Sequence, residues 1–333
     1  MGLVERLDRY QRRHSRAGLP IAVVYKFIDD QGTYLAAIIT YYGIVSLFPL
    51  LLLLSTILNF VLEGEPELQQ RVLDSALGQF PVVGDQLKDP NGITGSGIAL
   101  AVGIIGTIYG GLGVAQAAQN AMNTIWRVPR NERPNPLQSR LRSVLLLLVV
   151  GLSIIGTTIL SALGSNANAF GVGIGIGIKI LLILLALAVN SAVFTLGFRV
   201  ATAREMPWRW TFRGAIAAAV AWQLLQYFGT AYVGSVVKHA SETNSVFAFV
   251  LGLIAWIYLE SFAVVLAVEY NAVRELKLYP RSLLTPFTDH VDLTRADQRA
   301  YTGQAKAQQA KGFQDISVTF DKPQKPPDQR SGV

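Results

Sequence analysis

The chain contains no cysteine and few charged residues. The absence of cysteine excludes disulfide bonds, thiolate metal ligands and a cysteine nucleophile. Only 15% of its 333 residues are charged, below the ~25% typical of soluble proteins, whereas 51% are hydrophobic. Several long uncharged runs accompany this composition, and together they predict a membrane protein rather than a set of soluble domains.

Residues that soluble enzymes use for catalysis are scattered. His14, His239 and His290 lie in separate regions, and none belongs to a cluster with metal-ligand spacing. The chain has neither a Walker A phosphate-binding pattern nor a Gly-x-Ser-x-Gly nucleophile motif. We therefore expect no catalytic residues, no metal, no cofactor and no enzymatic activity.

The first long apolar run extends from Tyr34 to Leu62 without a charge. A helix rises about 1.5 Å per residue, so ~20 apolar residues cross the hydrocarbon core, and this run can span it with tilt. Ser46 and Pro49 lie within it. Proline inside a spanning helix removes one backbone hydrogen bond and kinks the helix. We predict that this kink forms one wall of the space between the helices.

We predict an all-α, polytopic integral membrane protein with six transmembrane helices. Each apolar stretch has about the ~20 residues that a crossing requires. The stretches are 34–62, 98–122, 144–163, a span within 171–198, 214–237 and 246–268.

Lysine and arginine are distributed unequally between the connections. If the six stretches all cross, 25 of the 29 basic residues fall on one side and three on the other. Basic residues concentrate on the cytoplasmic side of a membrane protein, so both termini are predicted to be cytoplasmic. The same asymmetry explains the basic pI of 9.6, so we expect no nucleic-acid partner.

The sequence divides into three parts. Residues 1–33 are a basic cytoplasmic segment with amphipathic helical spacing, which suits the surface of a membrane rich in anionic lipids; an ordinary solvated basic arm fits the same pattern. Residues 34–280 are the six-helix transmembrane domain. Residues 281–333 are polar, and their end is rich in lysine and proline, so we expect a mostly disordered cytoplasmic tail.

Polar side chains recur at similar depth in four of the spans. In the second span they fall on one helix face, because their spacing is 0, 3, 4 and 7. We expect these groups to line a polar cavity open to the cytoplasm; amide contacts between helices, and a protonated carboxyl bonded to a neighbouring helix, are the alternatives. The candidate cavity-lining residues are Gln116, Gln119, Asn120, Asn123, Asn190, Gln223, Gln226 and Glu260.

Two further patterns concern helix contacts. Gly106 with Gly110, and Gly173 with Gly177, form Gly-x-x-x-Gly pairs that let helix backbones approach closely; a broken, ligand-binding helix is the alternative.

Glu269 and Asn271 fall at the cytoplasmic end of the last span. A carboxylate is disfavoured at a helix C-terminus, so Glu269 needs a cationic or hydrogen-bonding partner. The candidates on that side are Arg127, Arg199 and Arg204.

Tyr41-Tyr42 followed by Ser46-Leu47-Phe48-Pro49-Leu50 resembles the first-span signature of the YihY/BrkB family of bacterial inner-membrane proteins. Other stretches are similar to later family motifs: Ala118 to Trp126, Pro207 to Ala215, Trp256 to Tyr258 and Glu269 to Asn271. The resemblance covers about residues 15–280, with departures at Ala267 and at Asn244 to Val246.

This resemblance implies six helices, cytoplasmic termini and a multi-pass protein in the bacterial plasma membrane. Some family members have carried a ribonuclease label, but this chain lacks the clustered histidines and acids for it. Our leading hypothesis is transport or handling of a small solute or lipid through the polar cavity. The alternative is a non-transporting membrane scaffold or envelope assembly factor. The substrate is unknown, and the sequence leaves open a homo-oligomer.

Overall fold

Helices are the regular elements of the computed structural model, which describes residues 3–14, 17–61, 97–165, 176–237, 242–285 and 291–321. The α-helices and one 3-10 turn are α1 (Leu3–Arg13), α2 (Gly18–Asp29), α3 (Gly32–Val61), α5 (Gly97–Ile125), η2 (Arg130–Glu132), α6 (Pro136–Ser165), α7 (Ile176–Ala201), α8 (Trp208–Val237), α9 (Glu242–Glu275) and α10 (Arg295–Lys306). The predicted all-α class is confirmed for these residues.

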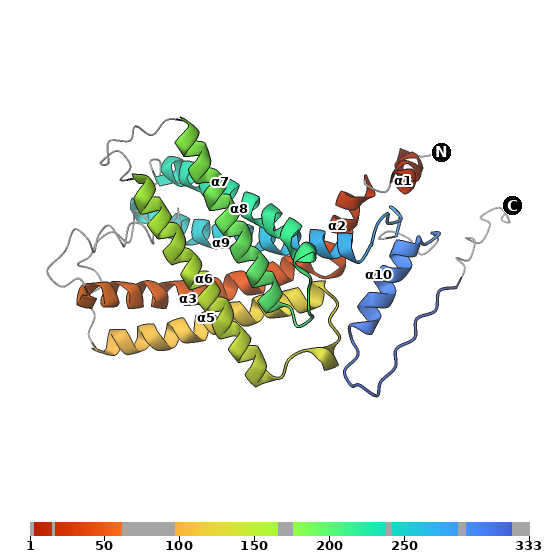
Figure 1. Cartoon of the computed structure of the whole chain (residues 1–333), viewed down its shortest axis with the longest axis horizontal. Helices are drawn as coiled ribbons and strands as arrows, with labels where there is room; N and C mark the ends of the chain where they lie inside the picture. The colour runs from red at the N-terminus through yellow and green to blue at the C-terminus, as the bar shows by residue number, and fades with distance from the viewer. Residues whose placement is uncertain are drawn as a thin grey trace.

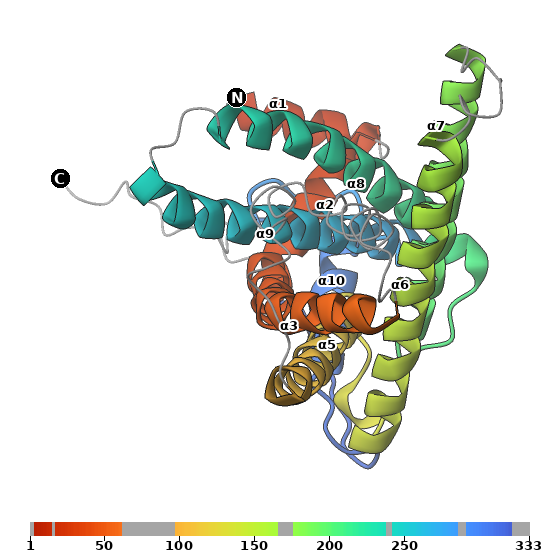
Figure 2. The same ribbon diagram turned by 90° about the vertical axis from the view of Figure 1, so that its left-hand side faces the viewer.

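Six long helices form a closed ring (Figures 1 and 2). In chain order, α3 contacts α5, α5 contacts α6, and the contacts continue through α7 and α8 to α9, which packs back against α3. The α5 helix also makes smaller contacts with α7 and α9. These helices cover the six stretches that we predicted to cross the membrane.

Three helices in the described part of the chain contain windows long and apolar enough to cross a membrane. They are Pro136–Ser153, Ile183–Ala201 and Val250–Glu275, and Gly32–Leu47 is a shorter apolar helix. The chain is therefore a helical integral membrane protein. The number of crossings remains the sequence-based prediction of six.

One end of the ring, which we call the basic end, holds the polar connections. It comprises α1, α2, residues 126–135 between α5 and α6, residues 202–207 between α7 and α8, and residues 276–285 and 291–321, toward the right of Figure 1. The α2 helix does not lie free on a surface. Its residues Ala22, Val23 and Phe27 are buried, and it packs against α9.

The segment after α9 differs from the expected disordered tail. Residues 295–306 form α10, whose N-terminus is closed by a capping box between Thr294 and Asp297. Ala296 and Ala300 are buried. The polar segment that contains α10 is therefore helical, because two buried alanines and the buried Asp297 anchor the helix. Residues 322–333 lie outside the described part.

Candidate functional site

The contact between α3 and α5 is built from the predicted glycine pair and the predicted kink residues. A Cβ atom on Gly106 would lie 2.7 Å from the Pro49 ring, and one on Gly110 would lie 2.5 Å from the Ser46 Cβ. Glycine is therefore required for this approach. Ser46 and Pro49 form a helix contact rather than the wall of an open space.

The structure shows no close contact for the second predicted glycine pair, Gly173 and Gly177, among the described residues. Gly173 lies outside the described residues. Gly177 lies on α7 with nothing within 4 Å of the position that its Cβ would occupy. Close packing at Gly173 and Gly177 therefore stays a prediction.

Two amides of the α5 stripe join helices instead of lining a cavity. Buried Gln119 donates through Nε2 to the Ser143 Oγ at 2.8 Å and to the Ser139 carbonyl at 3.1 Å on α6. Buried Asn123 accepts a hydrogen bond from the Ala203 backbone N–H at 2.7 Å. For these two residues the contacts are those of the alternative that the sequence also allowed, in which buried amides bond to neighbouring segments of the protein.

The other candidate residues differ in their exposure and in their hydrogen bonds. Exposed Asn120 accepts a hydrogen bond from Arg133 at 3.2 Å. Buried Glu260 lies 3.5 Å from the Gln226 amide, which bridges α9 and α8 with a long hydrogen bond. Asn190 and Gln223 are half-buried. Their predicted role in a cavity stays a prediction.

Gln116 does face a groove. The groove has a volume of about 390 Å³ and lies among α3, α5 and α6. We call it the α3–α5–α6 groove. It is lined by Tyr42, Ile105, Ile108, Tyr109, Leu112, Gly113, Gln116, Arg140 and Ser143. Its long wall is apolar, whereas the end nearest the basic end carries an amide, a hydroxyl and a guanidinium group.

A buried charge cluster joins three helices at the basic end. Lys26 on α2 is fully buried and donates through Nζ to the Glu269 Oε2 at 2.8 Å, to the Ile125 carbonyl at 2.8 Å, and to Asp30. The Ile125 carbonyl belongs to the C-terminus of α5, where a cation is favoured by the helix dipole. Lys26 is thus the partner that Glu269 was predicted to need.

Sequence reasoning proposed three arginines for this role and missed Lys26. A signal was present, because Lys26 lies in the largely apolar segment Gly18–Asp29 and Asp30 follows four residues later, directly after that segment. An ion pair at this spacing on a buried helix implies a third charged or polar group from elsewhere in the fold.

Arg127 approaches the same cluster without a direct ion pair among the described residues. It follows α5 with a φ of 54° and donates to the Arg299 carbonyl at 3.2 Å. Burial lowers the pKa of Arg127, although the nearby carboxylates Asp30 and Glu269 act in the opposite direction. Its position ties the α5 C-terminus to α10.

Asn271 holds the start of α8 against α9. Its Oδ1 accepts from the Gly214 N–H at 2.8 Å, and its Nδ2 donates to the Thr211 carbonyl at 3.1 Å. A Cβ on Gly214 would lie 2.3 Å from the Asn271 amide nitrogen, so this contact requires glycine. The polar contacts predicted for Glu269 and Asn271 are therefore two separate helix-joining devices.

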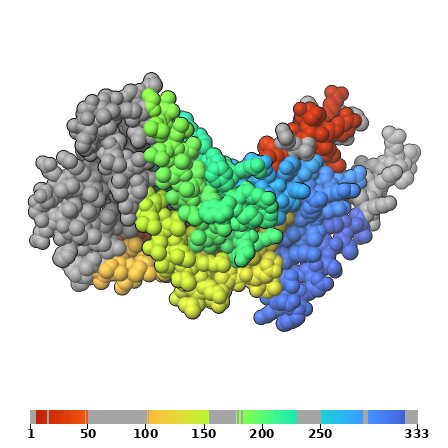
Figure 3. Space-filling view, in the orientation of Figure 1, coloured from red at the N-terminus to blue at the C-terminus, as the bar shows by residue number. Residues whose placement is uncertain are grey.

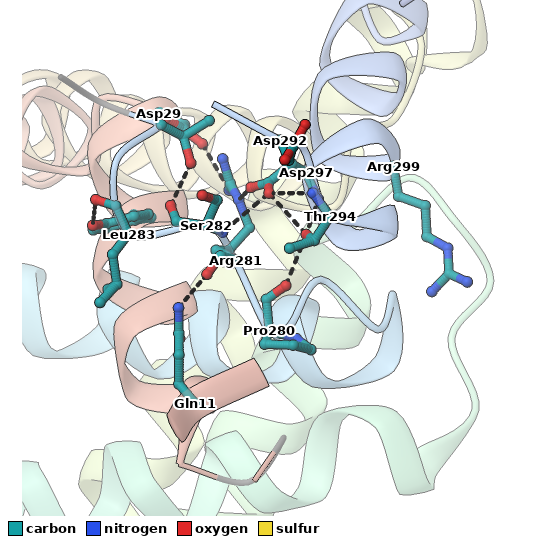
Figure 4. Close-up of polar contacts among 12 residues, drawn as sticks. Gln11, Asp29, Pro280, Arg281, Ser282, Leu283, Asp292, Thr294, Asp297 and Arg299 are labelled. Atoms are coloured by element: carbon teal, nitrogen blue, oxygen red, sulfur yellow. Dashed lines mark hydrogen bonds and ion pairs between the residues drawn. The ribbon is translucent and has the colours of Figure 1, made fainter. Parts of the chain in front are cut away.

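A second charge cluster secures the C-terminal segment (Figure 4). Arg281 donates through Nε to the Asp297 Oδ1 at 2.5 Å and through Nη1 to the Asp29 Oδ2 at 3.0 Å. Burial acts to lower the pKa of Arg281, but Asp29 and Asp297 outweigh it and the pKa is raised. Gln11 on α1 donates to the Arg281 carbonyl, so this cluster joins both terminal segments.

Most of the chain is similar to one known protein family. A family model described as Virulence factor BrkB matches residues 23–288. No curated protein and no solved structure gives a match. The matched range begins just before Lys26 and runs past Arg281, so it contains the ring of helices and both basic partners of the buried clusters. Since this range is most of the chain, the protein belongs to the Virulence factor BrkB family.

Proposed function

We propose that the protein is a multi-pass protein of a bacterial plasma membrane that binds and handles a lipid in the α3–α5–α6 groove. The observation that carries this proposal is the polarity of the groove, which is apolar along its length and polar and basic at one end. A lipid has the same division between its acyl chain and its headgroup.

The apolar wall suits an acyl chain. Ile105, Ile108 and Tyr109 are each more than half exposed, and in a membrane their surroundings are hydrocarbon. From Ile105 to Gln116 the helix rises about 16 Å, which matches a substantial part of an acyl chain. The volume of the groove falls within the ~300–1,000 Å³ range of small-ligand pockets.

The polar end suits a headgroup. Arg140 offers several N–H donors in a planar arrangement, and Gln116 offers an amide that both donates and accepts. Phosphate and ester oxygens of a lipid are acceptors for such donors. Gln116 is exposed on a helix expected to lie in the membrane, where an amide without a polar partner is costly.

The topology proposed from the basic residues places this headgroup end toward the cytoplasm. With six crossings and both termini inside, the bound lipid would belong to the cytoplasmic leaflet. Reporter fusions test this arrangement: a fluorescent protein after residue 333 should be active, and alkaline phosphatase inserted near residue 170 should be active. The reverse pattern would contradict the topology but would leave the groove itself untested.

Native mass spectrometry of the full-length protein tests lipid binding. We expect added phosphatidylglycerol to remain bound, and we expect Arg140→Gln with Gln116→Leu to weaken the binding about tenfold, because two headgroup contacts are lost. Arg130→Gln is the matched control, since Arg130 is exposed in η2 outside the groove. Equal lipid retention in the double variant and the control would refute the proposal.

A scaffold or assembly factor is the second candidate, and one observation favours it. The terminal helices α1, α2 and α10 are held together through Arg281, Asp29 and Gln11, which gives the basic end an ordered surface. Arg6 and Arg13 are exposed on α1. If this surface recruits partners, Arg6→Gln with Arg13→Gln should abolish complementation of a deletion strain while lipid retention stays normal.

A further inference from the structure

A second pocket lies at the basic end, away from the α3–α5–α6 groove. It has a volume of about 560 Å³ and lies among the start of α6, the end of α7 and the α7–α8 connection. Figure 3 shows this connection (green) on the surface beside α6 (yellow-green). We call it the arginine pocket; it is lined by Arg142, Arg199, Thr202, Ala203, Arg204, Glu205, Met206 and Pro207.

We propose that the arginine pocket binds a phosphate group, carried either by an anionic lipid headgroup or by a soluble phosphorylated ligand. Three guanidinium groups from two helices and one connection meet there. Glu205 is the acid among the lining residues, and within the described chain no ion pair joins it to Arg142, Arg199 or Arg204. Three guanidinium groups and one carboxylate therefore leave the pocket with a net positive charge.

Two of the arginines are held in place before any ligand binds. Arg142 donates through Nη1 to the Thr202 carbonyl at 3.1 Å, and the Arg199 guanidinium lies 4.0 Å from the centroid of the Trp208 ring. The Nη1 atom of Arg199 is buried and has no hydrogen-bond partner among the described residues. A buried donor without a partner is costly, and a rotation of this guanidinium toward a bound phosphate would supply the missing acceptor.

The helix dipole accounts for only part of this arrangement. Arg199 lies in the last turn of α7, where a cation is favoured by the dipole. Arg142 lies in the second turn of α6, beyond the first turn where the dipole acts, so a dipole does not explain its position. The start of α8 at Trp208 follows directly after Pro207 and has no acid in its first turn. Its dipole adds positive potential beside the pocket.

Binding measurements on the full-length protein in neutral detergent test the proposal with two probes. The probes are phosphatidylglycerol, with phosphatidylcholine as the zwitterionic comparison, and inorganic pyrophosphate. We expect at least one anionic probe to bind, and Arg142→Gln with Arg199→Gln to weaken it tenfold or more, because charge-assisted hydrogen bonds are lost. Arg209→Gln is the control, since Arg209 is exposed on α8 and does not line the pocket; it should change binding less than twofold.

The two probes distinguish the source of the phosphate. If phosphatidylglycerol binds and pyrophosphate does not displace it, the ligand is a lipid headgroup; if pyrophosphate binds and displaces the lipid, the ligand is soluble. Should the double variant misfold, the exposed Arg204→Gln serves in its place, with an expected loss of about threefold or more. No binding of either anionic probe, or equal binding by the pocket variants and Arg209→Gln, overturns the proposal. These measurements are made on a protein that also carries Gln116→Leu and Arg140→Gln, so that lipid held in the α3–α5–α6 groove does not contribute and failure of one site is distinguishable from failure of the other.

Discussion

Cationic side chains occur in two contrasting settings at the basic end. Lys26 and Arg281 are buried, and each is paired with two carboxylates from separate parts of the chain. Arg142, Arg199 and Arg204 line a pocket and have no ion pair within the described residues. The difference separates internally paired cations, which join segments of the fold, from cations without an ion pair, for which we propose an anion from outside as the partner.

Removing the Lys26 side chain should have the largest effect on stability. Lys26→Met leaves the buried carboxylates Glu269 and Asp30 without their cation, and breaking a buried ion pair in this way costs about 3–5 kcal/mol. Thermal unfolding in detergent, followed by size-exclusion chromatography, measures it. Lys277→Met is the control, because Lys277 is exposed. Equal melting temperatures for the two variants would show that the cluster contributes little.

Disrupting the second cluster should release the C-terminal segment more than it unfolds the ring. Asp297→Asn removes one charge partner of buried Arg281 and weakens the α10 capping box, with an expected loss of about 2–3 kcal/mol locally. Limited proteolysis should then cut near residues 295–306 much faster. Exposed Asp315→Asn is the matched control. Unchanged cleavage in Asp297→Asn would mean that Arg281 does not hold α10.

The contact between Gly110 and Ser46 is uncharged and lies within the ring, so it tests packing of the ring separately from the charged contacts at the basic end. Gly110→Ala would place a Cβ 2.6 Å from the Ser46 Cα and should cost about 1–3 kcal/mol through overpacking between α3 and α5. Gly151→Ala has nothing within 4 Å of the new Cβ and should be neutral or slightly stabilising. Unfolding in mixed micelles with increasing SDS compares them, and similar midpoints would argue against close packing at Gly110.

The smallest effect on stability is expected in the arginine pocket. Arg204→Gln alters an exposed side chain without an internal ion pair and should change stability by no more than about 0.5 kcal/mol. The same thermal measurement used for Lys26→Met detects this contrast. A destabilisation comparable to that of Lys26→Met would show that the pocket arginines are structural, and the division between the two settings would then fail.

The helical class and the approximate positions of the long helices were predictable, although α6 begins at Pro136 rather than at 144 and α9 ends at Glu275 rather than at 268. Apolar runs of membrane length in the sequence correspond to α3, α5, α6, α7, α8 and α9, because hydrocarbon requires every backbone group to bond within its own helix. The Gly106–Gly110 pair also predicted a close helix contact correctly, since small residues four apart expose backbone on one face.

The polar candidates could be recognised but their contacts could not. Gln116, Gln119 and Asn123 share one face of α5, yet the first opens to a groove, the second bonds to α6 and the third bonds to the α7–α8 connection. Helix periodicity assigns a face to a residue, but it does not say which neighbour covers each position along that face. Order in α10 was missed for a related reason, since its anchor Arg281 bonds to Asp297 on α10 and to the distant Asp29 on α2.

The sequence by itself determined a helical membrane protein with its basic residues gathered in alternate connections, because transfer of apolar surface and exclusion of charge from hydrocarbon depend on composition and length alone. Only the tertiary structure decided which cations are paired. Lys26 meets Glu269 across 243 residues of sequence and Arg281 meets Asp29 across 252. Pairing depends on distance in space and on shared burial, and it was the packing of α2 against α9 that brought Lys26 and Glu269 together.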